Sequence, residues 1–177
     1  GAGAFVAASD LMMPMPLISG GGQERGHRGG TEAVANLAGF GAAADVAAET
    51  IGRFGDCAEI RDRFERAIFD IAPDAVIHGA DAPRLANTLF FTVPGLKAET
   101  MQIAFDLEGM AVSAGSACSS GKVGRSHVLT AMGVGSEEGA IRISFGRETG
   151  EDAVARFTEA FHKIVTRARP ENRLERA

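Results

Sequence analysis

Apolar residues recur every three or four positions through residues 34–71, which is the spacing of one helix face. In residues 34–51 the repeating positions are mostly alanine and glycine, so another element can approach closely. The pattern is interrupted at residues 53–55, which predicts a bend or a restart. Thr31 precedes the first helix, and its hydroxyl is expected to cap the helix N-terminus. The second helix has a more strongly apolar stripe, formed by Cys57, Ile60, Phe64, Ile68 and Ile71.

After Pro73 the apolar segments become shorter and several of them alternate with polar residues, as strands do. In residues 140–146, Ile141 and Ile143 face one way, whereas Arg142 and Ser144 face the other. Helices are expected at 99–108, with Leu107 directed inward, at 126–132, and after Thr149. Strands are expected at 4–8, 75–78, 87–93, 110–113 and 140–146. This order predicts a small α/β layer in which helices pack on one face of a sheet.

Composition limits the class of protein. The 177 residues are 45% hydrophobic, enough for one core with room for a second lobe, and the net charge is −5. An acidic chain without a basic block is a poor nucleic-acid binder, and the arginines at 61, 63 and 66 are expected in ion pairs or on solvated faces. No apolar run approaches the roughly 20 residues that span a bilayer. Two cysteines make no disulfide framework, so a cytoplasmic location is expected.

Cys118 is the residue with the clearest chemical potential. Residues 113–121 are almost entirely serine, alanine and glycine, whereas Cys57 lies in an apolar helical stripe typical of a core cysteine. A reactive thiolate needs solvent access and a nearby cation, and Lys122 is close in sequence. The pattern alone leaves two readings open: a nucleophile on an accessible loop, or a turn cysteine without a role.

Two further features are candidates for ligand binding. Residues 20–31 form a glycine-dense loop that ends at Thr31, where backbone N–H groups and a hydroxyl suit a phosphate; a flexible linker is the alternative. Arg142 is one charge within an otherwise apolar strand, where it is expected to bind a carboxylate bidentately or to form a structural ion pair. The four histidines, at 27, 78, 127 and 162, show no metal-ligand spacing with the cysteines, and no metal is expected.

Together three segments resemble the cysteine desulfurases that serve iron–sulfur cluster assembly or nitrogen fixation, within the class V aminotransferase family. The first is Gly20-Gly21-Gly22-Gln23-Glu24-Arg25-Gly26-x-Arg28-x-Gly30-Thr31-Glu32. The second is Ser113-Ala114-Gly115-Ser116-Ala117-Cys118-Ser119-Ser120-Gly121. The third is Ala140-Ile141-Arg142-Ile143-Ser144-Phe145-Gly146-Arg147. Their order and separations also match, and the resemblance covers residues 1–165.

The resemblance implies the C-terminal part of an α/β, fold-type I pyridoxal-phosphate-dependent transferase. Residues 1–45 are then a remnant of the large cofactor-binding domain, residues 46–169 the small α/β domain with the Cys118 loop, and residues 170–177 a tail. Because the chain starts at Gly1 without methionine, an N-terminal segment is expected to precede it. By resemblance, that segment carries the Schiff-base lysine, and the chain alone is expected to be inactive.

The activity implied is removal of sulfur from L-cysteine, giving L-alanine and a Cys118 persulfide, with pyridoxal 5′-phosphate as cofactor. By resemblance, Thr31 binds the cofactor phosphate of the partner subunit in a homodimer, and Arg142 binds the substrate carboxylate. An iron–sulfur scaffold or another acceptor protein then receives the sulfur; no nucleic acid or membrane partner is implied. Two alternatives are a class V aminotransferase without sulfur transfer and a non-catalytic fragment that binds a scaffold or acceptor.

Overall fold

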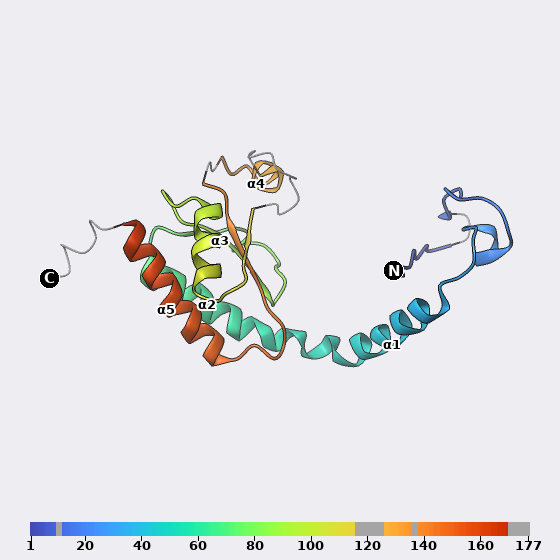
Figure 1. Ribbon diagram of the computed structural model, residues 1–177, viewed down its shortest axis with the longest axis horizontal. Helices are drawn as coiled ribbons and strands as arrows, with labels where there is room; N and C mark the ends of the chain where they lie inside the picture. Colours follow the sequence, from blue (N-terminus) through green and yellow to red (C-terminus); the bar gives the residue numbers. More distant parts are fainter. Residues whose placement is uncertain (10–11, 116–125, 136–137, 170–177) are drawn as a thin grey trace. The chain divides into compact units, whose positions relative to one another are not determined.

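The computed structural model describes residues 1–9, 12–115, 126–135 and 138–169 (Figure 1). Contacts within the chain divide it into two units, Gly1–Gly52 and Arg53–Ala177. Each unit is described by itself below. Among the described residues, no helix combines the length and the apolar character that crossing a membrane requires.

The first unit contains a short 3-10 helix, η2 (Gln23–Gly26), and the long helix α1 (Val34–Thr50). None of the residues of α1 is buried, although most of them are alanine, glycine or a larger apolar residue. The strand expected at residues 4–8 is wrong, because these residues form no strand. A strand needs a neighbouring strand to satisfy its N–H and C=O groups, and periodicity within five residues does not supply one.

Helix α1 ends at Thr50, shortly before the interruption of the pattern at residues 53–55. A 3-10 segment, η3 (Ile51–Asp56), follows it and leads into α2 (Cys57–Ile71), so the expected restart is confirmed. The second unit continues with the following elements: β1 (Val76–Ile77), β2 (Thr88–Thr92), α3 (Ala98–Leu107), β3 (Ser113–Ala114), α4 (His127–Ala131), β4 (Ile141–Ser144) and α5 (Glu151–Ala168).

The described strands form one antiparallel sheet in the order β1-β2-β4-β3. Leu89 pairs with Ile143, and Phe91 pairs with Ile141, so these side chains share one face of the sheet. All four are buried, and α2, α3 and α5 gather on one side of the strands in Figure 1. The expected α/β layer with helices on one face is therefore confirmed. We call the opposite side, which bears Phe90, Arg142 and Ser113, the open face.

The core between this sheet and its helices is built mainly of phenylalanine. Phe157 of α5 is fully buried, with its ring centroid 5.2 Å from Phe64 of α2 in an edge-to-face arrangement. Its ring also stacks on Phe105 of α3 at 5.4 Å and on Phe161 at 5.5 Å. Aromatic pairs in these arrangements stabilise the fold beyond their burial alone. Phe157 thus joins the three helices that cover the sheet.

Leu107, expected to face inward, is instead 82% exposed at the end of α3. The buried residues of this helix include Met101 and Phe105, which are four positions apart and lie on the same side. Leu107 is two positions beyond Phe105, or about 200° around the helix, and therefore points away from the core.

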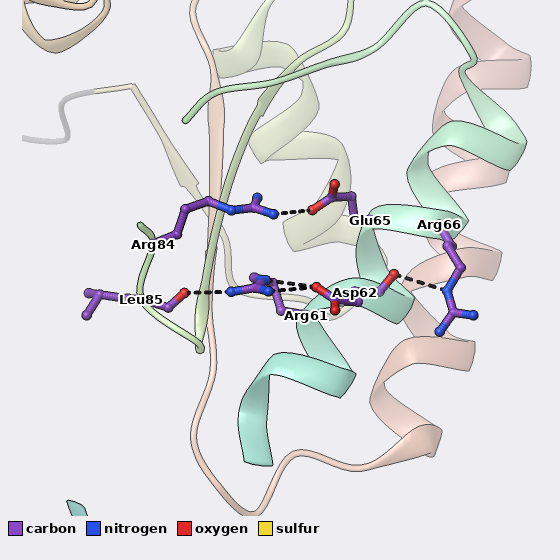
Figure 2. Close-up of polar contacts among 6 residues, drawn as sticks. All are labelled: Arg61, Asp62, Glu65, Arg66, Arg84 and Leu85. Atoms are coloured by element: carbon purple, nitrogen blue, oxygen red, sulfur yellow. Dashed lines mark hydrogen bonds and ion pairs between the residues drawn. The ribbon is translucent and has the colours of Figure 1, made fainter. Parts of the chain in front are cut away.

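Arginines of α2 are engaged in local ion pairs, as the sequence predicts. Arg61 forms an ion pair with Asp62 on the same helix at 2.8 Å and donates to the carbonyl oxygen of Leu85 at 3.4 Å (Figure 2). Arg84 donates to Glu65 at 3.0 Å. These bonds attach the connection between β1 and β2 to the helix. The Arg61 and Arg84 side chains thus have a structural role, since they hold the β1–β2 connection against α2.

Candidate active site

Arg142 lies in the middle of β4, on the open face of the sheet. The strand alternates buried and exposed residues, so the apolar contacts of Ile141 and Ile143 fix the direction of Arg142. On the neighbouring strands its cross-strand partners are Phe90 and Ser113. The Nη2 atom of Arg142 donates to Ser113 Oγ at 3.5 Å. An exposed guanidinium held on a rigid strand leaves most of its N–H donors for a ligand.

The segment that leads to Cys118 leaves the sheet beside Arg142. Strand β3 pairs Ser113 with Arg142 and Ala114 with Ile141, and the Gly115 N–H then donates to Ala140 O at 2.7 Å. Residues 116–125, which include Cys118 and Lys122, lie outside the described residues. The chain is described again at Ser126, whose Oγ accepts from the Leu129 N–H and caps α4, as predicted.

Cys57 is the cysteine that the structure describes, and it is 4% exposed. It is the first residue of α2, where the apolar stripe predicted a core position, and this prediction is confirmed. A cavity of about 230 Å³ lies at this end of the helix. Its lining residues are Arg53, Asp56, Cys57, Ile60, Arg147 and Thr149. Within the described residues, no group of three or more His, Cys, Asp or Glu side chains could hold a metal ion.

The glycine-dense loop in the first unit closes on itself. The Gly29 N–H donates to Ile18 O at 2.8 Å, and Gly29 is buried. A Cβ at this position would lie 2.7 Å from Gly20 O, so a larger residue requires the backbone to move. Arg28 then donates from Nη1 to Gly30 O at 2.6 Å. These contacts link the two ends of the glycine-dense loop just before Thr31.

Thr31 is exposed at the end of this loop, but it is not the helix cap that the sequence predicted. Helix α1 starts at Val34, and its N-cap, Ala33, offers no side-chain acceptor. The capping prediction was wrong because the chain takes two further non-helical residues after Thr31 before the helix begins. An exposed hydroxyl ahead of a helix N-terminus without a side-chain cap is suited to binding a phosphate group. Thr31 belongs to the first unit and Arg142 to the second.

His78 is a buried histidine that sequence reasoning left without a role. It lies directly after β1, is 7% exposed, and contacts Phe90 with a ring-centroid separation of 5.2 Å. Thr92 Oγ1 donates to Gly139 O at 2.7 Å, which uses its single proton. His78 Nε2 lies 2.7 Å from Thr92 Oγ1. Because Thr92 has no second proton to give, Nε2 carries a proton and donates it to Thr92 Oγ1. Burial lowers the pKa of His78 below its usual value of 6.5.

This pKa shift predicts a pH dependence of stability. Because the unfolded chain binds the His78 proton more tightly than the folded chain, the free energy of unfolding should fall as the pH drops below about 6.5. One proton limits the slope to about 1.4 kcal/mol per pH unit. Urea unfolding between pH 7.5 and 5.5 measures it, and His78→Gln should flatten the curve. An equally steep curve for the variant would contradict this assignment.

The comparisons with known proteins agree with this architecture. The family model for aminotransferase class V matches residues 1–157, and the chain belongs to this family. A cysteine desulfurase from Bradyrhizobium diazoefficiens is 42% identical over 164 residues, which are 89% of this chain and 41% of that protein. An IscS-like cysteine desulfurase from Mycobacterium tuberculosis is 36% identical over 173 residues, covering 96% of this chain and 44% of the relative.

A solved structure gives the same result for the fold. The NifS-like protein from Rickettsia africae matches with a TM-score of 0.73 and 36% identity, over 84% of this chain and 39% of that one. The resemblance to cysteine desulfurases and the α/β fold are thereby confirmed. The chain spans about two-fifths of the length of the relatives it matches, with shares between 39% and 44%.

Proposed function

We propose that this chain forms the C-terminal part of a cysteine desulfurase, which removes sulfur from L-cysteine and carries it as a persulfide on Cys118. The observation that carries the proposal is the pairing of β3 with β4. It places Ser113 and Ala114, which lead into the Cys118 segment, next to Arg142, whose side chain is exposed on the open face. A sulfur nucleophile and a carboxylate-binding cation close together are what this reaction requires.

Sequence distance allows the two groups to meet. Cys118 is three residues beyond Gly115, whose N–H is bonded to the residue two before Arg142. An extended chain covers at most about 3.6 Å per residue, so the thiol has a range of about 10 Å around this anchor. We propose that a small amino acid bound through its carboxylate to Arg142 lies within this range. The residues around Cys118 in the sequence are serine, alanine and glycine, which have small side chains or none.

In the proposed reaction, Arg142 holds the carboxylate of L-cysteine through paired N–H···O bonds. The Cys118 thiolate attacks the substrate sulfur, so that an S–S bond forms as the substrate C–S bond breaks. The electron pair of that bond stays with the substrate carbon, which takes up a proton to give L-alanine. When bound, pyridoxal 5′-phosphate supplies the electron-withdrawing ring that stabilises negative charge at the substrate carbon. We assign Thr31 to binding the cofactor phosphate. In the proposed homodimer, Thr31 of one subunit binds the phosphate of the cofactor held by the partner subunit.

The proposal extends to the organisation and partners of the protein. Residues 1–45 are assigned to a cofactor-binding domain and residues 46–169 to the small domain; the division of contacts after Gly52 supports a boundary in this region. The persulfide sulfur passes to an acceptor protein, such as an iron–sulfur scaffold, in the cytoplasm. The sulfur has to move between two proteins, which explains why a nucleophile is carried on a segment of small residues.

Mapping of the sulfur tests the proposal directly. The holoenzyme containing this chain is incubated with L-cysteine without added thiol, alkylated, and digested for mass spectrometry. We expect one additional sulfur atom on the peptide with Cys118, none on the peptide with Cys57, and L-alanine in matching amount. Transfer of the amino group to a keto acid, with no additional sulfur on the Cys118 peptide, would instead support a class V aminotransferase. Neither reaction would support a binding fragment.

A further inference from the structure

Four residues form a row across the open face of the sheet, one for each strand. In order they are His78, directly after β1, then Phe90, Arg142 and Ser113. Arg142 is flanked on one side by Phe90 and on the other by Ser113, through the pairing of β4 with β2 and β3. His78 continues the row beyond Phe90, since its N–H donates to Phe90 O at 2.8 Å. Phe90 has no polar side-chain atom, so Ser113 is the flanking residue that can hydrogen-bond to the guanidinium.

We propose that Ser113 is a positioning residue that holds the Arg142 guanidinium in the orientation that receives the substrate carboxylate. This inference rests on the proposed carboxylate-binding role of Arg142. The arginine side chain is long and exposed, so several rotamers are open to it unless a neighbour selects one. The hydrogen bond from Nη2 to Ser113 Oγ, 3.5 Å long, restricts that choice.

The hydrogen-bond inventory is compatible with this role. An arginine has five N–H donors, and a single contact to Ser113 leaves enough of them for a carboxylate bound through two oxygens. The Ser113 oxygen accepts from the guanidinium, so its own proton stays free to be donated. Ser113 is also the first residue of β3, which leads into the Cys118 segment. Ser113 therefore contacts Arg142, the residue proposed to bind the substrate, and also begins the strand that leads to Cys118.

A matched pair of variants separates the hydroxyl from the shape of the side chain. Ser113→Thr keeps the hydroxyl, whereas Ser113→Val has the same branched shape without it, and both suit a strand. The probes are L-alanine, which carries the carboxylate, and cysteamine, which is L-cysteine without it. Dissociation constants for both are measured by isothermal titration calorimetry on the holoenzyme, alongside KM and kcat for L-cysteine.

We expect Ser113→Val to weaken L-alanine binding and raise KM about threefold to tenfold, the range for one lost hydrogen bond. Cysteamine binding and kcat should stay within about twofold of the parent, and Ser113→Thr should stay within about twofold throughout. Unchanged L-alanine binding in Ser113→Val would overturn the inference. So would equal losses in the Thr and Val variants, or an equal loss for cysteamine, since these indicate general damage to the strand.

Arg142→Gln distinguishes failure of this inference from failure of the proposed function. If it weakens L-alanine binding strongly while Ser113→Val does not, Arg142 binds the carboxylate without help from Ser113, and only the positioning role is wrong. If Arg142→Gln leaves L-alanine binding unchanged, the carboxylate role of Arg142 is wrong, and the positioning role falls with it.

Discussion

Replacing Cys118 with alanine is expected to abolish the transfer of sulfur from L-cysteine, with a loss of at least about 10³-fold in the rate of alanine formation. The alanine side chain at position 118 has no nucleophile that could accept the substrate sulfur. The substrate C–S bond therefore has no favourable route to break. The rate is measured as L-alanine and sulfide released by the holoenzyme with a thiol acceptor present. Binding of L-alanine should remain unchanged, because Arg142, the residue proposed to bind its carboxylate, is intact.

Cys57 supplies the matched control. It is the same residue type, but it is buried at the start of α2. Cys57→Ala should therefore keep sulfur transfer within about twofold of the parent, at a modest cost in stability. If Cys118→Ala released sulfide as fast as the parent, an external thiol would be attacking the substrate directly. The persulfide role of Cys118 would then be wrong.

Truncation of Phe157 to alanine is expected to give the largest loss of stability, about 3–5 kcal/mol in the free energy of unfolding. Its ring is fully buried and contacts Phe64, Phe105 and Phe161, so alanine leaves a cavity bordered by three helices. The size of the loss depends on how far these rings can move into the space. Urea unfolding followed by circular dichroism measures it.

Leu107→Ala is the control for this truncation. It removes a large apolar side chain as well, but from a position that is 82% exposed at the end of α3. Its effect should stay within about 0.5 kcal/mol. Phe157→Leu should fall between the two, since it keeps much of the buried volume. A loss for Leu107→Ala as large as that for Phe157→Ala would contradict the observed orientation of α3.

Local periodicity was sufficient for many of the elements. The stripe through residues 57–71 identified α2 and the burial of Cys57, and the interruption at 53–55 falls in the 3-10 segment between α1 and α2. The alternation around Arg142 gave both the strand and the face of its side chain. In each case the pattern is imposed by burial of one face, which leaves a direct trace in the residues.

Features that depend on a helix end or on a distant segment were less predictable. Thr31 is a good capping residue by type, but α1 starts at Val34, three residues later, and its N-cap is Ala33. Leu107 is apolar, but it is on the wrong side of its helix relative to Phe105. Such outcomes depend on a shift of one or two residues, which composition does not specify.

The sequence alone determined the chemistry available to this protein: a thiol among small residues, a cation within an apolar strand, and a hydroxyl after a glycine loop. Only the tertiary structure decided which residues are neighbours. The register of β3 and β4 places Ser113 next to Arg142, and a bond from Gly29 to Ile18 closes the loop before Thr31. Both contacts depend on backbone hydrogen bonds between residues that are not neighbours in the sequence, 11 positions apart in the loop and 29 positions apart between β3 and β4.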